Sequence, residues 1–187
     1  MGLMADLGRG PVGVDTVIFI YFIEEHPQFL PLIEPLFREV DNGRRELVTS
    51  ALTLLEVLVV PYRSGDHLLA ERYEALLTQS HGVRVAEISR DHLRAAAQLR
   101  AATGVKTPDS LQLVAALAAG CATFLTNDRD LPTIHGLRIL QLASYGARSA
   151  QGAQDVAKVP CRVDKKLWVS APASLDGARP EKLRHRE

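Results

Sequence analysis

The stretch "KTPDSLQLVAALAAGCATFLTNDRDL", residues 106–131, decides the fold class of this chain. Thr107 is a typical helix cap and Pro108 a typical first helical residue, so an apolar helix is predicted to begin there. The segment "CATFLT" that follows predicts a short buried strand. Asp109 lies in the first turn of the helix, and Asp128 comes soon after the strand. This buried unit therefore has a carboxylate at each end, and an unpaired carboxylate is costly to bury.

Strand and helix patterns alternate along the rest of the chain. Strands are predicted from Val12, at "LVTS" (47–50), at "VRVAEIS" (83–89) and at "LRILQL" (137–142), with helical patterns between them. This alternation predicts an α/β fold with a central, mostly parallel sheet flanked by helices. The apolar segment "VIFIYF" (17–22) either extends the first strand or forms a buried helix, because periodicity does not separate the two.

The chain divides into three segments by composition. Residues 1–11 are predicted to be a flexible N-terminus, and residues 12–143 to form the folded domain. Residues 144–187 are rich in Ala, Gly, Ser and Gln at their start, without a clear period. They are predicted to be a low-complexity, mainly disordered tail.

The charge balance argues against a general nucleic-acid binder. The 187 residues contain 22 Lys and Arg and 22 Asp and Glu, a formal net charge of zero. Residues 1–157 hold 14 basic and 18 acidic residues, and residues 158–187 hold eight and four. A strongly basic surface is therefore not expected. If nucleic acid is the ligand, the positive field must be local or come from metal ions.

Several other classes are disfavoured. Cys121 and Cys161 are far apart, which indicates a reducing compartment rather than a disulfide framework, and the histidines lack zinc-site spacing. The longest apolar run, from Val17, is too short to cross a membrane, and no signal segment is evident, so a cytoplasmic protein is predicted. The GxGxxG pattern at 8–13 precedes every predicted strand and therefore does not predict a dinucleotide cofactor.

Glu56 interrupts an apolar helical pattern. In "ALTLLEVLVVPY" a helical wheel surrounds it with four apolar residues, Leu52, Leu55, Val59 and Val60. We therefore predict that Glu56 lies on a buried face and needs a partner. That partner is either a nearby arginine in a salt bridge or a metal or catalytic site.

Four acids are predicted to meet at one edge of the sheet. Asp15 ends the first strand, and ligand sites of open α/β sheets lie beyond the carboxyl ends of strands. Taken singly, Asp15, Asp109 and Asp128 could be turn formers or helix caps. Together with Glu56 they would repel one another, unless protonation or a cation relieves the repulsion. Oxygen ligands suit Mg²⁺ or Mn²⁺, and two such ions can bracket a phosphodiester.

Four motifs carry a resemblance to a known family. They are "VDT…FIY" (14–21), "TLLEV" (53–57), "KTPDSLQLVAAL" (106–117) and "LTNDRDL" (125–131). They resemble the PIN-domain family, and most specifically VapC-like toxins of bacterial toxin–antitoxin pairs. The likeness runs from about Val12 to Leu142. It implies a PIN-like fold and a Mg²⁺- or Mn²⁺-dependent endoribonuclease that is held inactive by a cognate antitoxin protein.

The resemblance assigns roles residue by residue. Asp15, Glu56, Asp109 and Asp128 match the four acids of the family and are the expected catalytic and metal-binding residues. Asp15 and Asp109 would be the main metal ligands, Glu56 would hold the metal or its water, and Asp128 would complete the pocket or hold a second metal. Further residues are expected to support the site from nearby: Thr16, Thr126, Asn127 and Asp130.

One departure from the family pattern leaves a second reading open. The first motif of the family usually has Asn or Ser where this chain has Val17. Loss of that polar side chain favours the alternative of a catalytically impaired PIN-fold binding subunit. A homodimer is expected as well. The apolar residues of the helices after Pro27 and around residues 68–77 either form a docking or dimer face or pack in the core. Arg129 and Lys106 could screen phosphates, and no aromatic platform for base stacking is evident.

Overall fold

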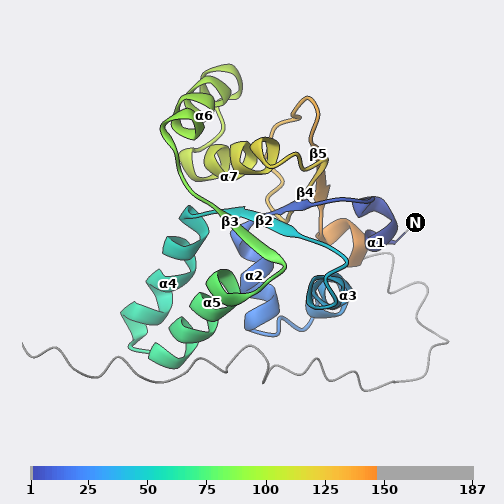
Figure 1. Cartoon of the computed structure of the whole chain (residues 1–187), viewed down its shortest axis with the longest axis vertical. Coiled ribbons are helices and arrows are strands. Elements are labelled where there is room, and N and C mark those ends of the chain that lie inside the picture. The colour runs from blue at the N-terminus through green and yellow to red at the C-terminus, as the bar shows by residue number, and fades with distance from the viewer. Residues whose placement is uncertain (1, 147–187) are drawn as a thin grey trace, which may run out of the picture.

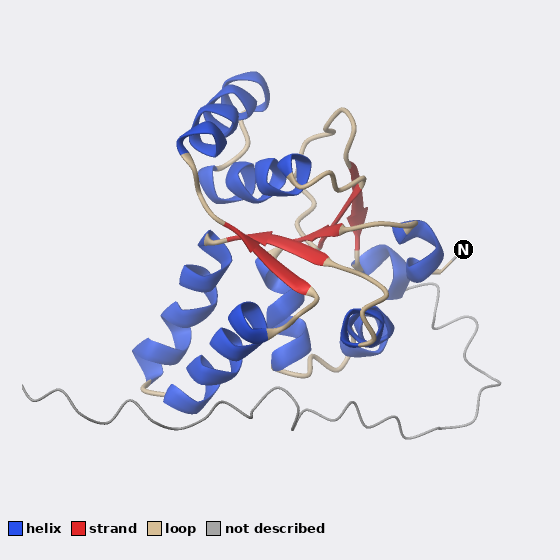
Figure 2. Ribbon diagram, viewed as in Figure 1, coloured by secondary structure: helices blue, strands red, loops and turns tan. Residues whose placement is uncertain are grey.

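A five-stranded parallel sheet forms the centre of the molecule (Figures 1 and 2). The computed structural model describes residues 2–146. The predicted tail therefore lies outside the described residues, apart from its first three positions. The strand order is β3-β2-β1-β4-β5, and every pairing is parallel. The strands are β1 (Val12–Val14), β2 (Leu47–Ser50), β3 (Val83–Ala86), β4 (Thr123–Thr126) and β5 (Arg138–Gln141). The predicted parallel α/β architecture is confirmed.

Helices cover both faces of the sheet. On one face α7, backed by α6, packs on β1 and β2, while α2, α4 and α5 lie on the other (Figure 1). None of the helices among residues 2–146 is long and apolar enough to span a membrane. The helices are α1 (Leu3–Leu7), α2 (Thr16–Ile23), α3 (Leu30–Asp41), α4 (Leu52–Ser64), α5 (His67–Gln79), α6 (Arg90–Thr103) and α7 (Thr107–Ala118).

The alternation of side chains along the strands divides the core into two layers. Val12 and Val14 of β1 enter the larger cluster beneath the sheet, whereas Phe124 of β4 packs with α7 above it. Gly13 faces α7, and a Cβ atom there would lie 2.6 Å from Cβ of Ala116 and 2.7 Å from Cδ2 of Phe124. Only glycine allows this approach. The close packing fixes the last turn of α7 against the middle of β1.

The connections create a switch point between β1 and β4. From β1 the chain moves to β2 and β3 on one side, then returns across the sheet to β4 and β5 on the other. The backbone N–H of Asp15 donates to the carbonyl oxygen of Leu125 at 3.0 Å, which ties the ends of the two strands together. Ligands of open α/β sheets bind at such a point, beyond the carboxyl ends of the strands.

Two segments near the N-terminus are helical where the sequence left the structure open or predicted flexibility. The segment "VIFIYF" forms helix α2, which settles the alternative that periodicity left open. We expected residues 1–11 to be flexible, yet Leu3–Leu7 form helix α1 with Leu3 and Leu7 buried. The Thr123 hydroxyl donates to the carbonyl oxygen of Leu7 at 2.8 Å. A five-residue helix has too few turns to produce a readable period, and tertiary contacts hold it in place.

The predicted orientation of α4 is wrong. Leu55 and Val60, which we expected around a buried Glu56, are 61% and 63% exposed. The buried residues of this helix are Thr53, Val57 and Pro61. We chose the buried face of the helical wheel by hydropathy alone. Hydropathy does not predict that hydrogen bonds to other threonines hold Thr53 in the interior. Glu56 is half-buried beside that threonine face.

Candidate functional site

The structure brings the four predicted acids together at the carboxyl edge of the sheet. Asp15 occupies the N-cap position of α2, directly after β1, and Asp128 lies in the loop after β4. Asp109 is in the first turn of α7, and Glu56 lies in the second turn of α4. Both Glu56 and Asp128 act electrostatically on Asp15, and both Asp15 and Asp128 act on Asp109. Acids from four separate elements thus share one electrostatic environment.

Burial and mutual repulsion disfavour ionisation of two of these acids. Burial is the main cause that raises the pKa of Asp15, and the negative charges of Glu56 and Asp128 raise it further. The hydroxyl of Thr126 opposes this rise by hydrogen bonding. Burial also raises the pKa of Asp109, together with the charges of Asp128 and Asp15, while Lys106 lowers it. A bound cation would reverse this balance because it favours the charged carboxylates.

Thr126 connects the ends of β1 and β4. Its hydroxyl donates to Oδ2 of Asp15 at 2.6 Å, and its Oγ1 accepts from the backbone N–H of Asp128 at 2.9 Å. Oδ1 of Asp128 accepts from the backbone N–H of Asp130 at 2.8 Å. The side chain of Gln141 donates to the carbonyl oxygen of Asp128. Thr126 therefore contacts the carboxylate of Asp15 and the backbone of Asp128.

Glu56 is held by hydroxyl and amide groups. The hydroxyl of Thr16 and Nε2 of Gln112 both donate to Oε2 of Glu56, the latter at 3.2 Å. Gln112 also donates to Oγ1 of Thr16 at 2.8 Å. Thr53 lies 3.0 Å from Thr16 and extends the network into the interior. No ion pair involves Glu56 within residues 2–146, so the predicted alternative of a salt bridge to arginine is wrong.

Sequence reasoning missed Gln112. It is 3% exposed, and its Oε1 is a buried atom that has no hydrogen-bond partner within the described part of the chain. The available signal was a single polar residue in the apolar middle of α7. Gln112 follows Asp109 by three positions, which places both on one face of the helix. An unsatisfied buried oxygen next to a group of acids is typical of a place where water or a cation binds.

The remaining predicted residues occupy different places. Asn127 donates to the Tyr21 hydroxyl at 3.2 Å and accepts from the backbone N–H of Ala143 at 3.0 Å, so it braces the loop after β4. Asp130 is exposed, and its backbone N–H donates to the side chain of Asp128. Val17 is half-buried and packs against the core beneath the sheet.

The donor chemistry fits a hard divalent cation, but the carboxylates are not arranged around one point. Among residues 2–146, no three Asp, Glu, His or Cys side chains are positioned to hold one metal ion. The acids that influence one another are nevertheless all oxygen donors, which suits Mg²⁺ or Mn²⁺. The unpaired Oε1 of Gln112 lies beside them. Binding therefore requires side-chain rotation of the acids toward a shared ion.

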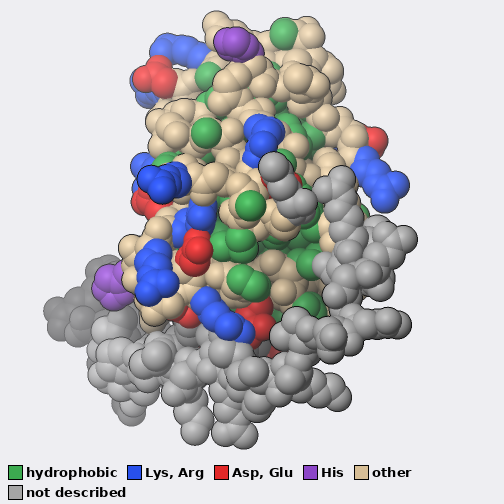
Figure 3. All heavy atoms as spheres, turned by 90° about the vertical axis from the view of Figure 1, so that its right-hand side faces the viewer, with side chains coloured by type: hydrophobic (Ala, Val, Ile, Leu, Met, Phe, Trp, Pro, Cys, Tyr) green, Lys and Arg blue, Asp and Glu red, His purple; other side chains and the backbone are tan. Residues whose placement is uncertain are grey.

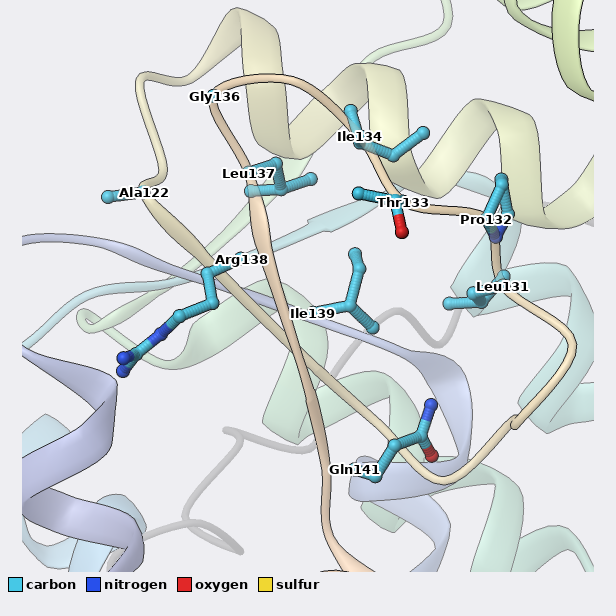
Figure 4. Close-up of a pocket in the computed structure, with 10 residues that line it drawn as sticks. All are labelled: Ala122, Leu131, Pro132, Thr133, Ile134, Gly136, Leu137, Arg138, Ile139 and Gln141. Atoms are coloured by element: carbon cyan, nitrogen blue, oxygen red, sulfur yellow. The ribbon is translucent and has the colours of Figure 1, made fainter.

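A hollow beside the site and the surface charges complete its surroundings. The hollow, about 590 Å³ in volume, lies between β5 and the preceding loop, where Ile134, Leu137 and Ile139 gather and Arg138 points away from them (Figure 4). The four acids do not line it. Basic and acidic side chains lie interspersed on the face shown in Figure 3. The described residues on this face therefore form no broad basic surface.

Comparison with known proteins identifies the family. The family model described as the PIN domain matches residues 12–137. The chain therefore belongs to the PIN-domain family, as the motifs indicated. A comparison with curated proteins finds no match.

Two solved structures share the fold. The first is VapBC2 from Rickettsia felis bound to a DNA fragment from its promoter, with 18% identity and a TM-score of 0.51 over 70% of this chain and 98% of that chain. The second is a toxin–antitoxin complex from Klebsiella pneumoniae, with 19% identity and a TM-score of 0.50 over 68% of this chain and 94% of that chain. At these identities the likeness concerns the fold.

Proposed function

We propose that this protein is a Mg²⁺- or Mn²⁺-dependent endoribonuclease and the toxin of a toxin–antitoxin pair. The observation that carries the proposal is the convergence of Asp15, Glu56, Asp109 and Asp128 at the switch point of a PIN-domain fold. PIN domains are generally nucleases. The two similar structures are toxin–antitoxin complexes, which supports an antitoxin as partner.

The proposed roles of the acids combine the family resemblance with the contacts that some of them make. Asp15 and Asp109 would be the main ligands of the cation, and Asp128 would complete the pocket or hold a second ion. A bound Mg²⁺ or Mn²⁺ supplies a Lewis acid for a phosphate oxygen and lowers the pKa of water. Glu56, fixed by Thr16 and Gln112, would orient the attacking water through its carboxylate. Thr126 keeps Asp15 and Asp128 in place.

The test is cleavage of a labelled pool of total tRNA and rRNA by the full chain, free of antitoxin. We expect cleavage in Mg²⁺ or Mn²⁺, none in excess chelator, and a loss of at least about 100-fold in Asp109→Asn. Asp91→Asn is a matched control, because Asp91 also lies in a first helical turn but pairs with Arg94 on the surface. Cleavage that persists in chelator, or in Asp109→Asn, would refute the proposal.

A homodimer is part of the proposal and rests on an exposed apolar stripe. The stripe is formed by Leu55, Val59, Val60 and Tyr62 of α4 with Leu68 of α5. Contiguous exposed apolar surface of this kind marks protein contacts. The predicted face at residues 68–77 is otherwise core, since Ala70, Tyr73, Leu76 and Leu77 are buried. We expect Val59→Asp to convert a dimer to a monomer in sedimentation velocity, and an unchanged mass would exclude this face.

A catalytically impaired binding subunit is the second candidate, and Val17 is the observation that favours it. The family's polar residue is missing there. Thr126 nevertheless holds Asp15 from the neighbouring strand, so the first acid does not lack a partner. This contact favours the nuclease.

A further inference from the structure

Three aromatic rings meet in the turn between α2 and α3. The aromatic cluster consists of Tyr21, His26 and Phe29. The ring centroids of Tyr21 and Phe29 are 4.6 Å apart, those of His26 and Phe29 are 4.8 Å apart, and those of Tyr21 and His26 are 4.7 Å apart. The three rings therefore form a triangle in mutual contact. Such contacts restrict the rings and present them as one surface.

The turn that carries the cluster is tightly held. The backbone N–H of His26 donates to the carbonyl oxygen of Tyr21 at 2.9 Å, and Glu25 adopts a φ of 55°. A non-glycine residue with positive φ is uncommon and marks a chain reversal that the surroundings maintain. Nδ1 of His26 accepts from the backbone N–H of Gln28 at 3.3 Å, which orients the imidazole. The arrangement of the rings is thus set before any ligand binds.

The cluster is joined to the candidate site. The Tyr21 hydroxyl accepts from Nδ2 of Asn127 at 3.2 Å, and Asn127 stands between Thr126 and Asp128. Tyr21 also shares helix α2 with Thr16, whose hydroxyl donates to Glu56. The cluster is therefore linked by a hydrogen bond to the loop that carries Asp128 and by helix α2 to a residue that contacts Glu56.

Two of the three aromatic residues keep part of their surface accessible. Phe29 is 7% exposed and forms the floor of the cluster. Tyr21 and His26 are half-buried, so part of each ring remains accessible. The Tyr and His rings are tilted by 59° to each other, and each stacks at 30° on the buried Phe ring. Together they provide a partly apolar surface with polar edges. Unpaired RNA bases stack on surfaces of this composition.

The charge of the domain indicates why such a contact is needed. Residues 2–146 contain 13 Lys and Arg against 17 Asp and Glu, a net charge of −4. Phosphate attraction, which supplies most affinity in basic nucleic-acid binders, is therefore weak here outside the cation site. Base stacking does not depend on net charge. It can hold a single-stranded substrate beside an acidic site.

We propose that the aromatic cluster is a stacking subsite for an unpaired RNA base next to the cleaved phosphate. The proposal rests on the proposed nuclease function and adds to it the part of the substrate that the protein grips. Tyr21 and His26 are the contact residues, and Phe29 and Asn127 position them.

The experiment is a cycle that removes the ring and the base separately and together. The cut is first mapped in a short single-stranded RNA, and an abasic nucleotide is then placed at each position flanking it. The value of kcat/KM is measured for wild type, Tyr21→Leu, His26→Leu and Tyr21→Phe, which keeps the ring but loses the hydroxyl. His67→Leu is the matched control, because His67 is exposed at the α4–α5 turn and also contacts an aromatic ring, that of Tyr62, with ring centroids 6.5 Å apart.

The expected result is coupling between one base and the cluster. Removal of that base lowers kcat/KM of wild type by about ten- to a hundredfold. On intact RNA, Tyr21→Leu lowers kcat/KM by a similar factor. On the abasic RNA, kcat/KM of Tyr21→Leu is less than about twofold below that of wild type. Tyr21→Phe loses less than Tyr21→Leu, because the ring remains. The effect of His67→Leu is independent of the base.

Three results would overturn the subsite. If the losses from Tyr21→Leu and from base removal multiply at every position, the ring does not contact a base. If Tyr21→Leu weakens antitoxin binding but shows no coupling to any base, the cluster is a protein-binding surface. If wild type neither binds nor cleaves RNA in Mg²⁺ or Mn²⁺, the proposed nuclease function fails and the subsite fails with it.

Discussion

The hydroxyl of Thr126 donates to Oδ2 of Asp15 at 2.6 Å, across 111 positions of the sequence. Oγ1 of Thr126 in turn accepts from the backbone N–H of Asp128. One threonine at the end of β4 thus aligns the acid after β1 with the acid after its own strand.

Replacement of Thr126 should therefore impair catalysis more than folding. We expect Thr126→Val to lower kcat/KM for RNA by about 10- to 100-fold and to cost about 1–2 kcal/mol of unfolding free energy, since it leaves one buried N–H unpaired. Thr123→Val is the control, because Thr123 is also buried on β4 but bonds to Leu7. It should cost similar stability in chemical denaturation, with activity within about twofold of wild type. Equal activity losses in both variants would contradict a positioning role.

The substitution Gln112→Leu should lower activity without lowering the stability of the fold. Gln112→Leu removes a donor to Glu56 but also removes a buried, unpaired oxygen. We expect kcat/KM to fall by about 5- to 30-fold while the melting temperature is unchanged or higher. Ser110→Ala is the control, because its buried hydroxyl bonds to Thr107 on the same helix. A Gln112→Leu enzyme with full activity would show that Glu56 needs no amide partner.

The raised pKa of Asp109 predicts a pH-dependent stability effect in metal-free protein. Because the folded pKa lies above 3.8, the folded state binds more protons than the unfolded state in the window above that value. Stability is therefore lost as pH rises through this window. Asp109→Asn removes this loss and should raise the melting temperature at pH 7 by about 1–3 °C, a small effect because Asp109 is partly solvated. The gain should shrink at pH 4 and be absent in Asp91→Asn.

Val17→Asn discriminates the nuclease from the impaired binding subunit. Val17 packs against the core, and Asp15 already has Thr126 as a partner. We expect the variant to lose about 1–2 kcal/mol of stability and to change kcat/KM by less than about threefold. An impaired subunit would instead gain activity sharply from a negligible level when the polar residue is restored.

The fold was predictable where patterns are long and failed where they are short or ambiguous. Helix α7 and strand β4 begin within one or two residues of their predicted positions, because proline, glycine and an apolar run mark them clearly. Helix α1 was missed because five residues carry no period. The inner face of α4 was assigned wrongly because Leu55 and Val60 are exposed while Thr53 is buried. Hydropathy alone does not distinguish a core face from a contact face.

The candidate site was predictable as a set of acids but not as a network. Strand ends and a helix mouth indicated Asp15, Asp109 and Asp128, because topology alone brings those positions together. Gln112 required knowledge of which turn of α7 faces α4. The aromatic cluster escaped notice because Tyr21, His26 and Phe29 follow no regular spacing and meet only through a reversal at Glu25.

The most direct test of the central claim is calorimetric titration of the full chain with Mn²⁺. We predict saturable binding by wild type and Asp91→Asn, and at least about tenfold weaker binding by Asp15→Asn and by Asp109→Asn. This result would show that the clustered carboxylates share the cation. Equal affinity in all four proteins would place the metal elsewhere and contradict the account.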